Sequence, residues 1–471
     1  QLEPRMSHPK PVILDDPRVD NPCSTNTAGD WSWRRSDPKR SYSENFYQAS
    51  LAERAAHPAL DEDTQCEALV IGAGLLGAST ALHLAEAGID TMLIEQDRVG
   101  ASASGRNGGQ LTPGLARWEA AAMLKHFSPD QAARLWRLTA QESMELIDAI
   151  IEQHALAVDR KRGHLTAAIH PGHLTALQNG VDARRALRDS APKMLTREAL
   201  SAHIATDAYY GALLDPIGGH LHPLALNLGL VQALADQGGR VHEQTRATAM
   251  HALDGRTAVV TDGGTIIADK VIVAAHVSSH TLLAKQARTA IPFYSYVAVT
   301  GPIPGGSAAL LPTDMAVYDT SLQIDYYRRV RGDRLLFGGS GSGSRWSTDK
   351  ARRYFEQRFR FLFPRQAPFE IDFLWSGAAD LTARGPTSAH CIDGRIYSVF
   401  GWSGHGVAQT VRIGKAISDA IRGDDDDFAM LCQIANPPIP FGRLLAPIAI
   451  PMGVGLLQAR ARLQPGKMIS F

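Results

Sequence analysis

The 471-residue sequence has few cysteines and no excess of charge of either sign. Its four cysteines lack the paired spacing of zinc sites and disulfide-rich domains, so we expect neither a metal site nor a disulfide framework. Lys and Arg number 48, as do Asp and Glu, and no segment is basic enough to follow a phosphate backbone. The composition therefore predicts no nucleic-acid partner and a reducing, cytoplasmic location.

Long uninterrupted apolar runs are also missing. The longest, residues 444–457, is interrupted by Pro447 and Pro451 and is too short to cross a bilayer, and the first residues do not resemble a secretory signal. We therefore expect no transmembrane span. Residues 444–463 are apolar and then basic, which favours docking on the protein's own body or on a second subunit, with a membrane surface as the alternative.

The length and the 44% hydrophobic content are sufficient for two or three domains. Residues 66–71, 75–87 and 91–95 alternate strand, helix and strand, which is a βαβ unit. Further expected elements are a long helix from Pro129, helices at 223–237 and 407–421, a strand at 164–169, a meander at 241–249, 256–261 and 265–275, and strands at 291–300, 321–330 and 333–338.

The βαβ unit contains a glycine motif between its first strand and its helix. Gly72 permits a tight turn, Gly74 lets the backbone approach a pyrophosphate, and Gly77 lets the helix pack on the sheet. Glu95 ends the second strand, where it can accept hydrogen bonds from ribose hydroxyls. The motif predicts a bound dinucleotide, and a carboxylate at position 95 disfavours NADP because it would repel a 2′-phosphate.

Two later segments have the composition of a ring-binding surface. Residues 101–110 are mostly small, so the main chain can lie against a flat ring whose polar edges Arg106 and Asn107 would reach. Residues 401–406 place glycines on both sides of His405, and the helix that follows favours negative charge on such a ring. A surface loop and a simple helix cap are the alternative interpretations.

Four features together resemble the FAD-dependent amine oxidases of the D-amino acid oxidase superfamily. They are the glycine motif with its distal Glu95, the sequence SGRNGGQ at 104–110, the meander before 271–275 and the sequence GWSGHGV at 401–407. Within that superfamily the resemblance is greatest to the bacterial γ-glutamylputrescine oxidases, over about residues 42–445. It implies an α/β fold, with a Rossmann-type FAD-binding domain and a discontinuous substrate domain built on an antiparallel sheet.

The resemblance also implies a division of the chain. We expect an N-terminal arm (1–41), an FAD-binding domain (42–115, 205–290 and 372–436), a substrate domain (116–204 and 291–371) and a helical C-terminal tail (437–471) that offers a contact for oligomers.

FAD is expected to bind non-covalently, because the Cys and His positions used by covalent members of the family carry other residues here. The expected cofactor-binding residues are Gly72, Gly74, Leu75, Leu76, Gly77, Glu95, Gln96, Ser104, Arg106, Asn107, Gly108, Gly109, Gln110, Leu111, Ala247, Ala274, Ala275, Trp402, Ser403, Gly404, His405, Gly406 and Val407.

The implied reaction is oxidative deamination. An amine that loses its proton in a poorly hydrated pocket gives a hydride from the carbon next to nitrogen to N5 of FAD, the imine hydrolyses, and O2 is the expected acceptor, giving H2O2. The expected catalytic residues are His405, Arg106 and Arg384, and the expected substrate-binding residues are Tyr326, Tyr327, Arg384 and Trp402.

Several alternatives stay open at this stage. Arg384 would serve equally well as a domain-interface residue, and the tyrosines at 294, 296, 318, 326 and 327 as core rather than an aromatic cage. No lysine lies between Lys285 and Lys350 to assist O2, so His405 or Arg106 would supply that charge, or another acceptor takes the electrons. The alternative functions are oxidation of a secondary amine or cyclic amino acid, tRNA modification, and flavin binding without activity.

Overall fold

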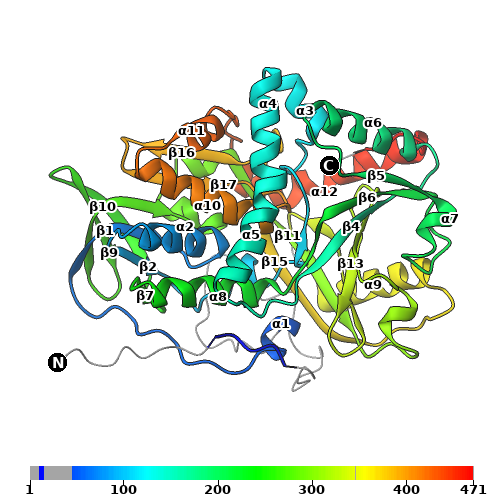
Figure 1. Cartoon of the computed structure of the whole chain (residues 1–471), viewed down its shortest axis with the longest axis horizontal. Coiled ribbons are helices and arrows are strands. Elements are labelled where there is room, and N and C mark those ends of the chain that lie inside the picture. The colour runs from blue at the N-terminus through cyan, green and yellow to red at the C-terminus, as the bar shows by residue number, and fades with distance from the viewer. Residues whose placement is uncertain (1–9, 15–44, 345, 470–471) are drawn as a thin grey trace.

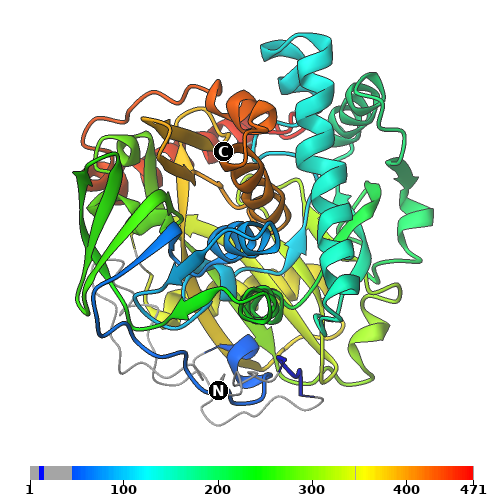
Figure 2. The same ribbon diagram turned by 60° about the vertical axis from the view of Figure 1, so that its left-hand side comes forward.

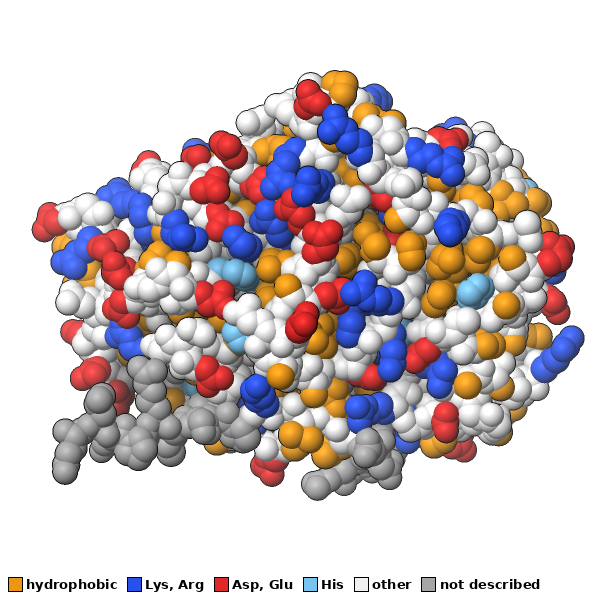
Figure 3. All heavy atoms as spheres, in the orientation of Figure 1, with side chains coloured by type: hydrophobic (Ala, Val, Ile, Leu, Met, Phe, Trp, Pro, Cys, Tyr) orange, Lys and Arg blue, Asp and Glu red, His pale blue; other side chains and the backbone are white. Residues whose placement is uncertain are grey.

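A computed structural model of the chain describes residues 10–14, 45–344 and 346–469, and its strands form two sheets that lie side by side (Figure 1). The expectation for residues 1–41 falls outside the described residues apart from 10–14. In that short piece Ile13 is buried and forms a β-bridge with Leu51, so it packs on the body of the protein. On the face drawn in Figure 3, side chains of both charges are interspersed.

The first sheet contains the predicted βαβ unit. Its strands, in spatial order, are β16 (Ser388–Ile392), β17 (Ile396–Phe400), β10 (Thr265–Val273), β1 (Thr64–Ile71), β2 (Thr91–Ile94) and β7 (Arg240–His242), while β8 (Ala247–Leu253) and β9 (Arg256–Thr261) form a meander with the first half of β10. The strands from β17 to β7 are parallel. Leu69 and Val70 are fully buried, as expected for a parallel sheet covered on both faces.

The expected strand at 241–249 was wrong, because the chain leaves the sheet between β7 and β8. Glu243 is buried there and forms ion pairs with Arg54 and Arg98. Gln244 has a φ of 54°, which turns the chain. The alternating pattern of residues 241–249 could not indicate this turn, because the ion-pair partners of Glu243 come from distant parts of the chain.

Three helices cover one face of the first sheet. They are α2 (Leu75–Glu86), α8 (Pro223–Asp236) and α10 (Val407–Ile421), and Figure 2 shows α2 between the other two. The α2 and α10 backbones approach closely at Gly414, where an added Cβ would lie 3.0 Å from the carbonyl oxygen of Leu76. This packing holds the start of α2 rigidly against the sheet.

The second sheet is mainly antiparallel. Its strands, in order, are β15 (Ile371–Thr382), β11 (Ala290–Thr300), β14 (Arg334–Ser342), β13 (Tyr326–Val330), β12 (Ala316–Asp319), β4 (Lys161–Ala167), β6 (Gly211–His220) and β3 (Gln110–Leu111), with β5 (Lys193–Thr196) beside β6. The strand expected at 321–330 begins only at Tyr326, because the backbone N–H groups of Ser321 and Asp325 donate to Asp319 and form a turn.

The other helices surround these sheets. They are α1 (Phe46–Ala49), α3 (Ala120–His126), α4 (Pro129–Trp136), α5 (Glu142–Gln153), α6 (His173–Ala186), α7 (Arg197–Leu200), α9 (Thr348–Leu362), α11 (Asp426–Cys432) and α12 (Gly442–Leu463). The predicted long helix from Pro129 is formed by α4, a π turn and α5. The predicted α/β class with two sheets is confirmed.

The prolines of the C-terminal apolar run do not interrupt its helix. α12 continues through Pro447 and Pro451 over 22 residues, and among the described residues it is the helix long and apolar enough to cross a membrane. The absence of a membrane span therefore stays a prediction.

The division into domains also stays a prediction, and the sheets do not follow its boundaries. β6 and β15 both begin within or next to expected FAD-binding segments, but both belong to the second sheet.

Candidate functional site

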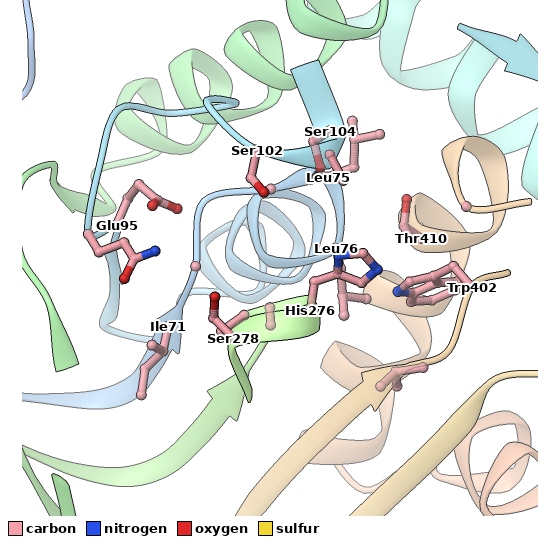
Figure 4. A pocket seen from close by; sticks show the side chains of 18 of the residues that line it. Ile71, Leu75, Leu76, Glu95, Ser102, Ser104, His276, Ser278, Trp402 and Thr410 are labelled. Carbon is pink, nitrogen blue, oxygen red and sulfur yellow. Dashed lines mark hydrogen bonds between the residues drawn. The ribbon is translucent and has the colours of Figure 1, made fainter. Parts of the chain in front are cut away.

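A cavity of about 630 Å³ opens at the carboxyl ends of the parallel strands (Figure 4). Ile71 and Ile94 end β1 and β2, and Ala274 follows β10, so three neighbouring strands deliver residues to the same edge. The volume lies in the range of small-molecule and cofactor sites. Figure 4 shows Glu95 and Trp402 at opposite ends of the cavity, with the start of α2 between them. The site therefore suits an elongated ligand.

The glycine turn forms the centre of this site. Gly72 has a φ of 107°, which disfavours residues with a Cβ, and its N–H donates to the carbonyl of Ile94 over 2.8 Å. A Cβ on Gly77 would lie 1.9 Å from the carbonyl oxygen of Gly72. Gly74 precedes the first turn of α2, whose positive end faces the cavity. These residues make an anion-binding helix start.

Glu95 lies beside this helix start. Its carboxylate accepts hydrogen bonds from the backbone N–H groups of Ala73, over 2.8 Å, and Asp97, over 3.0 Å. Burial raises the pKa of Glu95 to about 7, although these two hydrogen bonds act in the opposite direction. An ionised Glu95 can accept hydrogen bonds from a bound hydroxyl group.

The loop after β2 is fixed by its own side chains. Ser104 Oγ accepts a hydrogen bond from Leu75 N over 2.9 Å, which joins the loop to the start of α2. The Asn107 amide donates to the carbonyls of Ala103 and Ser104, and its oxygen accepts from Gly109 N. The loop is therefore held in one conformation along the cavity.

The turn before α10 is held by Asp380 of β15. Its carboxylate accepts from Gly401 N over 2.6 Å and Trp402 N over 2.8 Å, and it lies 2.9 Å from His276 Nε2. Burial raises the pKa of Asp380, but His276 and the two N–H groups outweigh that effect and hold this pKa below its usual value. Two sheets and the turn after β10 thus meet at one carboxylate.

A cluster of polar and aromatic side chains lies on the second sheet near this turn. The rings of His164 and Tyr318 are 4.5 Å apart, and those of Tyr318 and His405 are 6.5 Å apart. Gln110 Oε1 lies 3.2 Å from His164 Nε2, and Tyr326 is the β-sheet partner of Tyr318. We refer to these five residues, Gln110, His164, Tyr318, Tyr326 and His405, as the tyrosine–histidine cluster.

Burial dominates the protonation of this cluster. It lowers the pKa of His405 to about 4 and that of His164 to about 3, so both rings are neutral near pH 7. Burial, and after it the charge of Glu119, raise the pKa of Tyr318. The side chains of the cluster are therefore uncharged near pH 7, and the charge of Glu119 acts on Tyr318.

The family comparison agrees with this geometry. Residues 67–420 match the family described as FAD dependent oxidoreductase, abbreviated DAO. The chain belongs to this family. The sequence resemblance is thus confirmed, and the protein is an FAD-dependent oxidoreductase related to amine and amino acid oxidases.

Two curated relatives span almost the whole chain. The γ-glutamylputrescine oxidoreductase of Escherichia coli (strain K12) is 32% identical over 424 residues, covering 90% of this chain and 99% of that protein. The probable oxidoreductase OrdL of Haemophilus influenzae is 31% identical and covers 87% of this chain and 95% of its own length.

Solved structures show the same fold. Glycine oxidase from Geobacillus kaustophilus aligns with a TM-score of 0.66 at 20% identity, covering 77% of this chain and 96% of that one. L-proline dehydrogenase from P. horikoshii also has a TM-score of 0.66, at 17% identity, covering 79% of this chain and 96% of its own. The FAD-dependent oxidoreductase fold is therefore shared across enzymes with different substrates.

The residues present fit FAD. The glycine turn leaves a space beside α2 that no Cβ fills, and Glu95 and Trp402 mark the two ends of an elongated cavity. Of the residues expected to bind the cofactor, those that line the cavity are Gly72, Gly74, Leu75, Leu76, Glu95, Gln96, Ser104, Asn107, Ala247, Ala274, Ala275, Trp402, Gly404, Gly406 and Val407.

Other expected cofactor residues lie behind this lining. Arg106 is buried, with Nε donating to the carbonyl of Ser376, and its own carbonyl accepts from Trp375 Nε1. The remaining ones are Gly77 inside the glycine turn, Gly108, Gly109, Gln110 and Leu111 in the continuation of the loop into β3, and Ser403 and His405 in the turn before α10. Their contact with FAD stays a prediction.

Two of the expected substrate ligands lie elsewhere. Arg384 is exposed and donates to the carbonyl of Ala435, a placement that favours the alternative structural role. Tyr327 is fully buried, with its ring stacked on Phe337 and its hydroxyl donating to Tyr209. Tyr326, on the opposite side of the same strand, packs close to Gly108, where an added Cβ would lie 2.4 Å from its ring.

Sequence reasoning missed four residues of the site. His276 and Asp380 had no local motif, because their partners are distant in the chain, and Arg443 was given no role. Arg328 was given no role from the sequence; it is buried and donates to the carbonyls of Gly108 and Leu221. Within the described residues no cluster of His, Cys, Asp and Glu could hold a metal ion, and Cys66, Cys391 and Cys432 are free thiols.

Proposed function

We propose that the protein oxidises an amine of the γ-glutamylputrescine class, with FAD bound non-covalently and O2 as the acceptor. The observation that carries this proposal is the tyrosine–histidine cluster: His405 lies in the turn that borders the cofactor cavity, and its ring faces that of Tyr318, which packs on His164 of the second sheet. The E. coli relative that covers 90% of the chain supports the choice of substrate class. A role in polyamine catabolism and a cytoplasmic location belong to the same proposal.

The cluster suits recognition of an amine. Tyrosine rings attract a cationic ammonium group through their faces, and the charge of Glu119, which acts on Tyr318, would attract it further. The neutral imidazoles of His164, which is buried, and of His405, which is half-buried, offer no repelling charge and disfavour the protonated amine once water is excluded. The cluster would thereby deliver a neutral amine. FAD, when bound, accepts a hydride from the carbon next to the amine nitrogen.

Arg106 is the cation proposed to assist the acceptor half of the reaction. The sequence left His405 and Arg106 as candidates, and a neutral His405 cannot supply positive charge at pH 7. Arg106 belongs to the loop after β2. Its guanidinium is buried, and Nε donates a hydrogen bond to the carbonyl of Ser376. Arg106→Met would therefore slow reoxidation by O2 more than reduction by the amine, whereas Arg106→Lys would restore part of the rate.

The test is anaerobic mixing of the FAD-loaded protein with an amine panel. We expect γ-glutamylputrescine to bleach the flavin absorbance faster than putrescine, sarcosine, pipecolate or glycine, and air to restore it with release of peroxide. Glu119→Gln should raise KM for the amine with little change in kcat. Faster bleaching by sarcosine or pipecolate would favour the secondary-amine alternative, and bleaching without peroxide would favour a dehydrogenase. A flavin that no member of the panel reduces would refute the proposal.

A further inference from the structure

α12 carries a continuous apolar stripe that the rest of the described protein leaves uncovered. Leu444, Ile448, Met452 and Leu456 follow one another at intervals of four residues and therefore lie along one side of the helix. Their side chains are between 63% and 71% exposed. Monomeric soluble proteins seldom expose so many large apolar side chains in one row. The stripe therefore indicates a contact surface.

The opposite side of α12 is attached to the protein. Ala446 and Ile450 are buried against Leu381, together with Ile291 and Phe293 of β11. This packing fixes which side of the helix faces outward. The helix lies against β11 and β14, behind β6 in the view of Figure 1.

Both ends of α12 are also tied to the body. At the first turn, Arg443 Nη2 donates to the carbonyl of Val277 over 2.6 Å. Just past the last turn, the carbonyl of Pro465 lies 3.1 Å from Nε2 of His173, which is buried on α6. A helix held at its middle and at both ends cannot cross a bilayer without losing these contacts. α12 can, however, lie flat on one.

The charged residues of α12 itself and of the segment that follows it are all positive. The sequence contains no Asp or Glu after Asp427, and Arg460, Arg462 and Lys467 are exposed at the C-terminal end of α12. Cations beside an exposed apolar stripe complement the headgroups of an anionic bilayer, which contribute about 1 kcal/mol per cation. A second copy of the stripe would bring further cations to the contact and no carboxylate from this segment.

We propose that α12 is an in-plane membrane helix, which docks the protein on the surface of a bilayer rich in anionic lipid. Leu444, Ile448, Met452 and Leu456 enter the boundary between headgroups and acyl chains, while Arg460 and Arg462 contact anionic headgroups. Because Arg443 and Leu444 also line the cofactor cavity, the docked face lies beside that cavity.

Co-sedimentation with vesicles tests this proposal. The FAD-loaded protein should bind vesicles of phosphatidylcholine and phosphatidylglycerol, bind pure phosphatidylcholine much more weakly, and be released by about 0.5 M NaCl or by alkaline carbonate. A helix that spans the bilayer would resist carbonate, and that result would overturn the in-plane arrangement. Lack of binding to either vesicle would overturn the proposal as a whole.

Variants separate the apolar and the charged contributions. Replacing Ile448, Met452 and Leu456 by Ser should lower the vesicle-bound to free ratio at least about tenfold. Replacing Arg460, Arg462 and Lys467 by Gln should lower it about fivefold per cation removed. The matched control replaces Leu253 of β8 and Phe361 of α9, which are exposed apolar side chains outside α12, by Ser and should leave binding unchanged. Unchanged flavin content and thermal midpoint show that each variant is folded.

Sedimentation equilibrium without lipid addresses a second copy as the occupant. We expect a mass that the Ile448, Met452 and Leu456 variant does not change. If the unsubstituted protein forms an oligomer that this variant dissociates, and neither form binds vesicles, the stripe is a subunit interface and the proposal is wrong.

Discussion

His276 Nε2 lies 2.9 Å from Asp380 Oδ1, and this pair joins the turn after β10 to the last residues of β15. The same Asp380 carboxylate accepts hydrogen bonds from the backbone N–H groups of Gly401 and of Trp402, which lines the cofactor cavity. One buried carboxylate thus joins three separate parts of the chain through a histidine side chain and two neighbouring backbone N–H groups.

Asp380→Asn should weaken both folding and FAD binding. The amide cannot accept both backbone N–H groups as a carboxylate does, and it loses the charge that faces His276. We expect the free energy of unfolding to fall by about 2–3 kcal/mol, measured by urea denaturation, with a weaker FAD titration. Asp182→Asn, which alters an exposed pair with Arg185, should change neither quantity. Equal effects of the two changes would contradict the proposed role.

FAD binding should depend on the protonation of Glu95. The pKa of Glu95 is raised to about 7, and only the ionised carboxylate can accept two ribose hydroxyl groups. Affinity should therefore rise from pH 5.5 to pH 8, by roughly thirtyfold if binding requires deprotonation, and then level off. Fluorescence titration of the apoprotein with FAD measures this change. Glu95→Gln should bind more weakly at pH 8 with a flat pH profile, and a profile that keeps its slope would assign the titration to another group.

Gly77→Ala should disrupt the glycine turn. The new Cβ would lie 1.9 Å from the carbonyl oxygen of Gly72, so backbone must move. We expect a loss of about 3 kcal/mol in unfolding free energy and failure to retain FAD after gel filtration. Gly180→Ala in α6, where nothing lies within 4 Å of the added Cβ, should instead stabilise the protein by about 0.5–1 kcal/mol. A stable, flavin-loaded Gly77→Ala protein would contradict the close packing at this turn.

Acid should destabilise the protein through histidines that are buried in the neutral form. The pKa of His405 is lowered to about 4, and those of His164 and His222 to about 3, whereas each is near 6.5 in the unfolded chain. A group whose folded pKa is lowered binds more protons when unfolded, so stability is full above about pH 6.5 and falls as the pH drops toward 4. Each ring should cost about 2 kcal/mol between pH 7 and pH 5.

His222 provides a single-residue test of this pH dependence. Its Nδ1 accepts a hydrogen bond from Ala225 N and caps α8, and Nε2 lies 3.0 Å from Ser50 Oγ. Asn also caps helices but does not titrate, so His222→Asn should reduce the loss between pH 7 and pH 5 by about 2 kcal/mol. Chemical denaturation at both pH values gives the difference. An unchanged loss would show that His222 does not contribute.

Local patterns predicted the parts of the fold whose partners are close in the sequence. The βαβ unit with its glycines places Gly72 to Glu95 within a short segment, and the helix at 407–421 has the predicted bounds. Contacts between distant segments were not predictable in the same way. Asp380 and His276 are more than a hundred residues apart, and nothing near either residue indicates the other. Likewise, adjacent residues of a strand point to opposite faces, but the sequence could not show that Tyr326 rather than Tyr327 faces the loop at Gly108 until the sheet order was known.

The cofactor cavity takes its walls from positions as far apart as Ile71 and Leu444. A nascent chain emerging from the ribosome therefore presents the glycine turn long before the residues that close the cavity have been synthesised. The complete cavity can form only after nearly the whole polypeptide has been made, and a product that stops before Arg443 would leave the cavity without one of its walls.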